Sequence, residues 1–261
     1  MEVRWLGWAG VEIESQGTRV VVDPLADAEA VFAPLKERMP SVDPPEVVPP
    51  RPDAVAGLIT HLHRDHADAD ALAQALGADA SVYEPPRYGG DRVEQAGVGQ
   101  ADAELTAAGL TRSIVDPWTS IEAGPFRLTA LPAVDGLGDP QVSWLIEAEG
   151  RRVLHLGDTM FHGWWWRVAQ RFGAPDAVLA PINGARVHFP HRRPASSSPA
   201  RLTPEQAVLA AELLRAGTLL PIHYGGYSLP GLYEPIPDAV EKVRSARDAV
   251  TVLEPGEHLT L

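Results

Sequence analysis

The segment His61-Leu62-His63-Arg64-Asp65-His66 constrains this chain more than any other part of the sequence. It follows an apolar run, Val55 to Ile59, which has the length and composition of a buried strand. A strand that ends in such a loop can direct three imidazoles and one carboxylate into one cleft. Neutral imidazole and carboxylate are the side chains that bind zinc, iron or manganese. A solvated turn can contain a histidine or two, but the dense spacing after a strand favours a metal site.

The composition is that of a globular protein. The 261 residues fit one large domain or two small ones, and 45% hydrophobic with 22% charged residues allow a sizeable core. The net charge of -13 argues against nucleic acid as the main partner, because binding would have to overcome long-range repulsion.

The chain has no cysteine, which excludes disulfides, thiolate nucleophiles and cysteine zinc sites. Its first residues lack a basic region followed by a signal-length apolar stretch, and no run approaches the roughly eighteen apolar residues of a membrane span. We therefore expect a soluble, cytoplasmic protein without a membrane partner. The oligomeric state stays open.

Short β-prone runs alternate with strand–loop–helix units along the chain, which suggests two α/β halves that face each other. Helices are expected over 31–38, 68–76, 91–109, 163–172, 203–216 and 236–246, and the chain should close with strands over 250–253 and 258–261. Two long segments, 24–52 and 184–202, interrupt the pattern. Both are expected to be lid or insertion loops, and the first is expected either to cover the cleft or to be a plain surface insertion.

Aspartate and histidine recur where apolar runs end. Asp135 follows the run 128–134, Asp158 follows 153–157, and His223 follows 219–222. Ligands offered from strand ends are held by a rigid scaffold, which a preorganised metal site requires.

These residues resemble the metallo-β-lactamase superfamily of metal-dependent hydrolases over nearly the whole chain. His61 to His66 match its H-x-H-x-D-H signature, Leu154–Thr159 resembles its later Gly-Asp-Thr segment, and Pro221–Gly225 resembles the segment of its last metal-binding histidine. The stretches 5–10, 20–24 and 253–257 resemble the branch that includes L-ascorbate-6-phosphate lactonase and N-acyl-phosphatidylethanolamine phospholipase D. The resemblance implies a single α/β domain folded as a four-layer αβ/βα sandwich, with metals at one edge between two sheets.

The resemblance also implies a dinuclear site with two divalent metal ions, zinc first, with manganese or iron as alternatives. One metal would be bound by His61 and His63, and the other by Asp65, His66 and His223. Asp158 would bridge the two. Asp135 stands where the family usually supplies a third histidine to the first metal, and as a carboxylate it can still be a ligand.

The implied reaction is hydrolysis of a small-molecule ester, lactone, amide or phosphodiester by a metal-activated hydroxide, which Asp65 and Asp158 would orient. A nuclease is a second enzyme interpretation, against which the acidic charge counts. A redox diiron role is disfavoured, because such relatives usually carry glutamate where His63 stands. The alternative outside catalysis is a metal- or ligand-binding protein of the same fold.

Several residues outside the signature are further candidates. His162 and His188 are proposed to face the cleft as catalytic groups, whereas His155, inside an apolar strand, is interpreted as a hydrogen-bonded core residue. The tryptophans at 164–166 would bury one or two indoles or wall the pocket. A cationic group in the second long loop could bind an anionic part of the substrate; it comprises Arg186, Arg192, Arg193 and Arg201.

Overall fold

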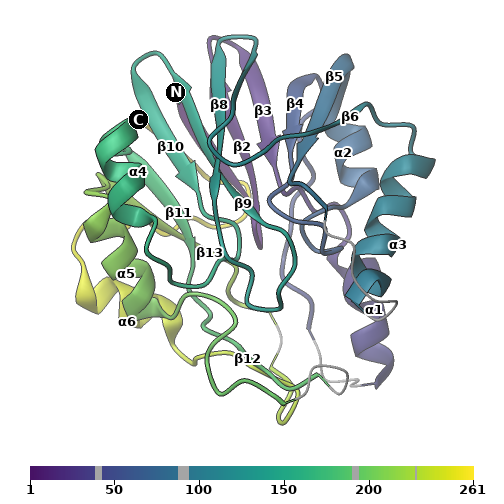
Figure 1. The fold of residues 1–261 in the computed structure, drawn as a ribbon, viewed down its shortest axis with the longest axis vertical. Helices are drawn as coiled ribbons and strands as arrows, with labels where there is room; N and C mark the ends of the chain where they lie inside the picture. Colours follow the sequence, from purple (N-terminus) through teal and green to yellow (C-terminus); the bar gives the residue numbers. More distant parts are fainter. Residues whose placement is uncertain (39–42, 88–93, 190–193, 227) are drawn as a thin grey trace.

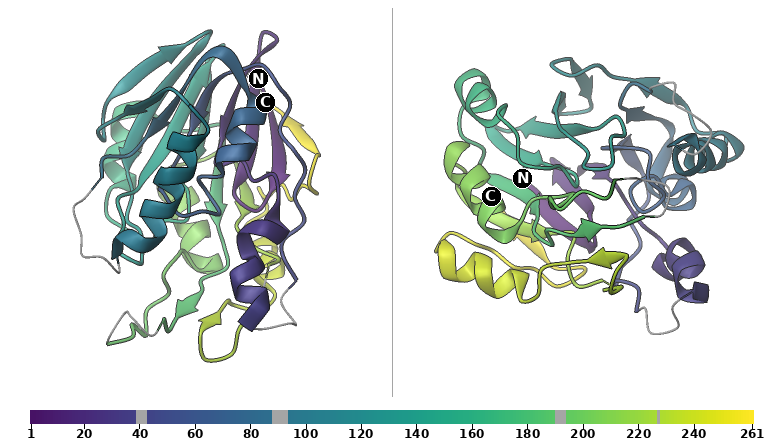
Figure 2. Two further views of the ribbon diagram at one scale, coloured as in Figure 1. Left: turned by 90° about the vertical axis from the view of Figure 1, so that its right-hand side faces the viewer. Right: turned by 60° about the horizontal axis from the view of Figure 1, so that its bottom comes forward.

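Two β-sheets lie face to face, with helices on the outer side of each (Figures 1 and 2). This computed structural model describes residues 1–38, 43–87, 94–189, 194–226 and 228–261, and for 34–38 and 94–97 only the backbone. Helices α2 and α3 cover the first sheet, and α4, α5 and α6 cover the second. The layers confirm the predicted αβ/βα sandwich.

Within the described residues the first sheet has the strand order β15-β1-β2-β3-β4-β5-β6. β15 to β3 run antiparallel to their neighbours, and β3 to β6 run parallel. The strands span Glu2–Gly7 (β1), Gly10–Ser15 (β2), Thr18–Val22 (β3), Ala54–Leu58 (β4), Leu76–Glu84 (β5), Arg112–Ile114 (β6) and His258–Thr260 (β15).

The second sheet has the order β13-β11-β10-β9-β8-β7. Its strands β7 to β10 are antiparallel, and β10, β11 and β13 are parallel. They span Ser120–Ala123 (β7), Phe126–Pro132 (β8), Val142–Ala148 (β9), Arg151–His155 (β10), Ala177–Pro181 (β11) and Thr218–Ile222 (β13). A separate short pair joins β12 (Arg186–Val187) to β14 (Tyr233–Glu234).

Both faces of the central strands are buried, which explains their continuous apolar runs. In β3, Val20 and Val22 pack into the core between the sheets, while Val21 packs outward under the helices of the first sheet. In β10, Val153 faces the central core and Leu154 packs outward under the helices of the second sheet. This period of two follows from the pleat of a strand.

Two of the helices begin at a residue whose side chain caps them. Asp68 accepts hydrogen bonds from the backbone N–H groups of Asp70 and Ala71 at the start of α2, and Thr203 forms a capping box with Gln206 at the start of α5. The helices span Ala28–Arg38 (α1), Ala69–Ala75 (α2), Glu94–Ala107 (α3), Trp165–Phe172 (α4), Pro204–Leu213 (α5) and Ala239–Ala246 (α6).

Three expected elements differ from the structure. The strand expected over 250–253 is reduced to one isolated bridge between Val250 and Leu219. The last helix begins at Ala239 rather than at 236, because Pro237 removes an N–H donor and Asp238 takes a left-handed conformation with φ of 54°. The segment 184–202 contains β12, which pairs with a strand that the sequence did not predict.

None of the described helices combines the length and apolar composition needed to cross a bilayer. The two lid interpretations, for 24–52 and 184–202, stay predictions. Part of the first segment lies against the end of β1, where the backbone N–H of Val48 donates to the carbonyl of Leu6 at 2.8 Å. Gly7, with φ of 94°, has no room for a side chain because the backbone of Glu46 lies against it.

The topology brings the carboxyl ends of β3, β4, β8, β10, β11 and β13 to one edge of the sandwich, at the bottom of Figure 1. Parallel strands share the direction in which their chains leave the sheet, so the loops that follow them meet there. The predicted ligands follow four of these strands, namely β4, β8, β10 and β13.

Candidate metal centre

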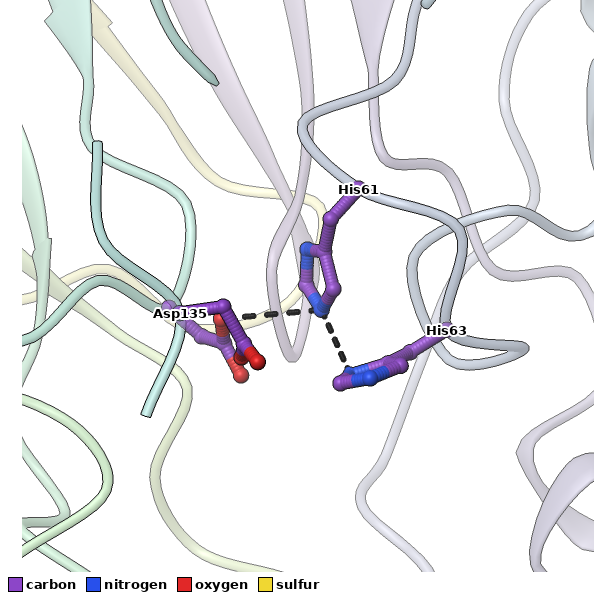
Figure 3. Close-up of side chains that lie close together, drawn as sticks. His61, His63 and Asp135 are labelled. Carbon is purple, nitrogen blue, oxygen red and sulfur yellow. Dashed lines mark hydrogen bonds and ion pairs between the residues drawn. The ribbon is translucent and has the colours of Figure 1, made fainter. Parts of the chain in front are cut away.

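The predicted ligands lie in two adjacent clusters at this edge. In each cluster the donor atoms lie within 4.8 Å of one another. The first cluster contains His61, His63, Asp135 and Asp158, and the second contains Asp65, His66 and His223. Figure 3 shows His61, His63 and Asp135 pointing toward one another.

Two imidazole nitrogens converge in the first cluster. His61 Nε2 lies 2.8 Å from His63 Nδ1 and 3.6 Å from Asp158 Oδ1. Asp135 joins them from the loop after β8, and its Oδ2 accepts hydrogen bonds from the backbone N–H groups of Leu137 and Asp139. This carboxylate therefore closes its own turn and also contributes an oxygen to the cluster.

The second cluster repeats the arrangement. The Nε2 atoms of His66 and His223 lie 3.1 Å apart, and they lie 3.6 Å and 3.7 Å from Asp65 Oδ2. Asp158 links the two clusters, because its Oδ1 faces His61 while its Oδ2 lies 3.9 Å from His223 Nε2. One carboxylate oxygen thus faces each cluster.

Each ligand histidine is held through its other ring nitrogen. Such contacts orient imidazole ligands and fix their tautomers. The contacts are His61 Nδ1 with Thr60 Oγ1 (3.1 Å), His63 Nε2 with Asp139 Oδ2 (2.7 Å), His66 Nδ1 with Asp23 Oδ2 (2.7 Å) and His223 Nδ1 with the Asn183 amide (3.1 Å).

The donor set fits divalent cations. Two pairs of imidazole nitrogens face each other beside three carboxylates, and four of these side chains are completely buried. Burial lowers the pKa of His223 to about 4 and keeps the pKa of His61 well below its usual range, so both are neutral, as metal binding requires. Burial opposes charge on His63 as well, but its hydrogen bond to Asp139 and the nearby Asp135 raise its pKa to about 9.

The second ligand cluster is partly fixed by a strained backbone. His223 has a φ of 56° and Trp8 a φ of 50°, a left-handed conformation that side chains seldom adopt. The two residues are joined, because the N–H of His223 donates to the carbonyl of Trp8 at 2.9 Å. The Trp8 ring lies against the His223 ring, and its Nε1 donates to Asp65 Oδ2 at 2.9 Å.

Neither further histidine candidate belongs to these clusters. His162 stacks on Trp165 with ring centroids 3.8 Å apart, and burial lowers its pKa to about 4. His188 is half-buried, and its backbone N–H donates to the carbonyl of Leu232. Their catalytic roles stay predictions. His155 is buried with Nε2 2.8 Å from the carbonyl of Ala9, as interpreted from the sequence.

One tryptophan of the run 164–166 belongs to the core. Trp165 is buried under the second sheet, whereas Trp164 and Trp166 are exposed by 37% and 52%. The core interpretation therefore holds for one indole of the three.

Several residues at the centre were not identified from the sequence. Gln141 Nε2 donates to Asp158 Oδ1 at 3.2 Å, and Trp8 supports Asp65 as described above. Asp23 follows the apolar run of β3 in the same way as the ligands follow theirs, so the strand-end rule could have found it. Gln141 and Trp8 belong to no such pattern.

Arg201 has a different place from the one expected. It was grouped with the cationic residues of a loop that could bind substrate, but it is only 6% exposed, and its Nε donates to Asp158 Oδ2 at 2.7 Å. Arg186 is exposed, while Arg192 and Arg193 lie outside the described residues. Binding of an anionic substrate group by this loop stays a prediction.

A cavity of about 630 Å³ lies beside the second cluster, and none of the candidate ligands lines it. Its wall includes Trp8 and Asn183, which contact the ligands Asp65 and His223, and Tyr233, which accepts a hydrogen bond from Asn183. The cavity has the volume of a small-molecule site. The charged residues of its lining are mainly acidic and comprise Glu46, Asp238, Glu241, Glu254 and Arg244.

Comparison with known proteins gives one family and one fold. The family model described as "Beta-lactamase superfamily domain" matches residues 18–224. A UPF0173 metal-dependent hydrolase of Thermococcus kodakarensis is 26% identical, with all of both chains covered. Igni18, a metallo hydrolase of Ignicoccus hospitalis, has a similar structure with a TM-score of 0.63 and 22% identity, covering 99% of this chain and 97% of its own.

The fold also occurs within a larger protein. CmlA, a diiron beta-hydroxylase from Streptomyces venezuelae, matches with a TM-score of 0.72 and 19% identity. The match covers this whole chain and 54% of CmlA. At this identity the likeness concerns the fold alone.

Proposed function

Since this chain belongs to the beta-lactamase superfamily and is a metal-dependent hydrolase, we propose that its centre holds two divalent cations, zinc in the first place, and cleaves an uncharged small-molecule ester, lactone or amide. The observation that carries the proposal is Asp158, whose two oxygens face the two clusters. A carboxylate in this position suits a bridging ligand. The branch suggested by the sequence, the cytoplasmic location and a phosphodiester substrate stay predictions.

His61, His63, Asp135 and Asp158 would hold one cation, and Asp65, His66 and His223 would hold the other, with Asp158 shared. Bound cations would supply the Lewis acidity that activates water for hydrolysis. The chain itself contributes fixed orientation, since the four histidines are held by Thr60, Asp139, Asp23 and Asn183. No protein nucleophile is needed, in keeping with the absence of cysteine.

Solvent reaches the centre from one side. The side chains of His63, Asp65 and Asp139 are 16%, 18% and 12% exposed. The other four side chains are completely buried, namely those of His61, His66, Asp158 and His223. A substrate would therefore approach past Asp65. The Trp8 indole donates a hydrogen bond to Oδ2 of this carboxylate. The orientation of Asp65 would therefore stay fixed while a substrate and the attacking water approach.

The adjoining cavity supports an uncharged substrate. The cavity reaches the clusters through Trp8 and Asn183, and the four carboxylates against one guanidinium in its lining would repel an anionic group that approaches from this side. This favours esters, lactones and amides over phosphodiesters, which carry a negative charge.

The test compares metal content with turnover. Purified protein is assayed with a neutral p-nitrophenyl ester and with bis-p-nitrophenyl phosphate, before and after the metal is removed by a chelator and restored. We expect two metals per chain, faster hydrolysis of the neutral ester, and loss and recovery of activity with the metal. Asp158→Asn should lose both metal and turnover, whereas Asp176→Asn, on a partly exposed ion pair with Arg151, should lose neither.

Two results would contradict the proposal. Full turnover in metal-free protein would remove the metal from the reaction. One bound metal without turnover on either substrate would instead support the metal-binding alternative considered from the sequence.

A further inference from the structure

Arg201 is a buried cation beside the metal centre. Only 6% of the residue is exposed, its Nε donates to Asp158 Oδ2 at 2.7 Å, and its guanidinium carbon lies 5.6 Å from the centre of the Tyr233 ring. Its Nη1 is buried without a hydrogen-bond partner among the described residues. A buried guanidinium is costly unless nearby anions compensate it.

Asp158 is not the only anion near this guanidinium. The loop that carries Asp135 lies directly against the segment that carries Arg201, because Gly136 meets the backbone of Ala200 so closely that a Cβ at 136 would collide with the Ala200 carbonyl group. Asp135 and Arg201 are the sequence neighbours of Gly136 and Ala200, so they lie on two loops that touch each other. Asp135 and Asp158 also share the first cluster, with donor atoms within 4.8 Å.

Arg201 offsets part of the negative charge that gathers at the first cluster. Two carboxylates and two imidazoles converge there, and Asp65 adds a third carboxylate from the second cluster. The arginine therefore offsets one of three carboxylate charges. With Asp135 and Arg201 both present, the centre carries the same formal charge as it would with a neutral ligand at 135 and no arginine.

We propose that Arg201 is the counter-charge of Asp135, which cancels the negative charge of that carboxylate and so sets the affinity of the centre for cations. The inference deepens the proposed function, because it concerns the charge of the same metal centre. It makes Arg201 a positioning residue that acts through Asp158 and Asp135 rather than on a substrate.

The proposal predicts effects of opposite sign on zinc binding. Arg201→Met makes the centre more negative and should tighten zinc binding about tenfold, which corresponds to the interaction of one additional charge at intermediate dielectric. Asp135→Asn makes it less negative and should weaken binding at least tenfold. The double variant, which still lacks the Asp135 carboxylate as a ligand, should bind zinc about tenfold more tightly than Asp135→Asn alone, and Arg201→Lys, which keeps the charge, should bind zinc like the natural protein.

Zinc affinity is measured by competition with a chelator, at fixed pH and low salt, on proteins whose fold is checked by circular dichroism. A purely structural role of Arg201 predicts that Arg201→Met weakens zinc binding and that the double variant binds no better than Asp135→Asn. Either result would overturn the proposal.

Folding provides a second readout. If Arg201→Met does not fold because its buried carboxylates repel one another, Asp135→Asn in the same chain should restore folding, and Asp176→Asn should not. A double variant, with Arg201→Met and Asp135→Asn, that remains unfolded would refute the proposal that Arg201 offsets the charge of Asp135. Should the natural protein bind no zinc or other divalent cation, the proposed function fails, while the unfolding temperatures of the single and double variants still decide the role of Arg201.

Discussion

At the scale of single residues, the centre is built from ligands that are each held by a second residue. His66 is an example, because its Nε2 faces the second cluster while its Nδ1 is fixed by the buried Asp23. Asp23 in turn accepts hydrogen bonds from the backbone N–H and the hydroxyl of Thr60, which precedes the histidine signature. One carboxylate thus orients two parts of the same loop.

Replacement of Asp23 should therefore weaken metal binding without removing a ligand. We expect Asp23→Ala to lower zinc affinity about ten- to hundredfold, as loss of such partners does elsewhere. Zinc titration against a chelator measures the change. Asp27 lies four residues further along the chain, at an exposed turn where it accepts a hydrogen bond from the backbone N–H of Ala30. Asp27→Asn is therefore the control and should bind zinc normally. Equal affinities for Asp23→Ala and the natural protein would show that His66 needs no support.

The partly buried His162 predicts a pH dependence of stability. Burial lowers its pKa to about 4 in the folded protein, below the value of about 6.5 in the unfolded chain. Between these values only the unfolded chain binds the proton, so stability is complete above about pH 6.5 and falls as the pH falls toward 4.

Unfolding by urea at pH 7 and pH 5 tests this shift. Between pH 7 and pH 5, the unfolding free energy of the natural protein should fall by about 1 to 2 kcal/mol more than that of His162→Asn. Asparagine can still accept the hydrogen bond that the backbone N–H of Trp164 donates to His162 Nδ1. His258→Asn, whose side chain is 57% exposed, should keep the pH dependence of the natural protein. A His162→Asn variant with an unchanged pH dependence would contradict the shift.

At the scale of elements, the strands and their trailing loops could be predicted, because local sequence determines both. The apolar runs of β4, β10 and β13 identify strands that are buried on both faces, and the residues that follow them are candidate ligands. The capping box of α5 also follows from four consecutive residues. The strand expected over 250–253 was wrong, because its only pairing in the described chain is the bridge to Leu219.

Contacts between distant elements could not be predicted in this way. Arg201, Gln141 and Trp8 reach the centre from three different segments, and nothing in their local sequence marks them. The pair β12–β14 likewise consists of two short strands joined only by tertiary structure. These features depend on how closely two loops approach each other.

The approach of Gly136 to Ala200 is such a contact and can be tested. Gly136→Ala would place a methyl group against the backbone of Ala200, which has no rotamer to move away. We expect a loss of about 1 to 3 kcal/mol in unfolding free energy, the usual cost of overpacking. Chemical denaturation measures it.

Gly99 provides the matched control, since it lies in α3 with nothing within 4 Å of an added Cβ. Gly99→Ala should stabilise the protein by about 0.5 to 1 kcal/mol, because alanine favours a helix over glycine. If both alanine variants were equally stable, the contact between the loops of Asp135 and Arg201 would not be tight.

At the scale of the whole molecule, each cluster draws ligands from both halves of the sandwich. His61, His63, Asp65 and His66 follow β4 of the first sheet, while Asp135, Asp158 and His223 follow strands of the second. The sheets also meet through side-chain packing in the core between them and through hydrogen bonds such as that from the Val142 N–H to the carbonyl of Thr60 at 2.9 Å. A cation in either cluster would therefore join the two halves.

Metal binding should accordingly stabilise the whole fold rather than one loop. At a free metal concentration about a thousandfold above Kd, linkage adds about 4 kcal/mol to the unfolding free energy. Calorimetry of metal-free and zinc-loaded protein should show one cooperative transition that moves to higher temperature with zinc. An unchanged transition temperature, with zinc shown to be bound, would contradict this coupling.

The cavity beside the centre also bears on how such a protein could be redesigned or diversified. Its lining comes largely from residues 45–46, 224–241 and 252–255, whereas the ligands follow β4, β8, β10 and β13. The ligand His223 lies next to one of these segments but points away into the second cluster. If the proposed substrate enters from this cavity, substitutions in these segments should alter which molecules are accepted while the reacting groups stay in place, so that one scaffold could give rise to a series of enzymes with different substrate preferences.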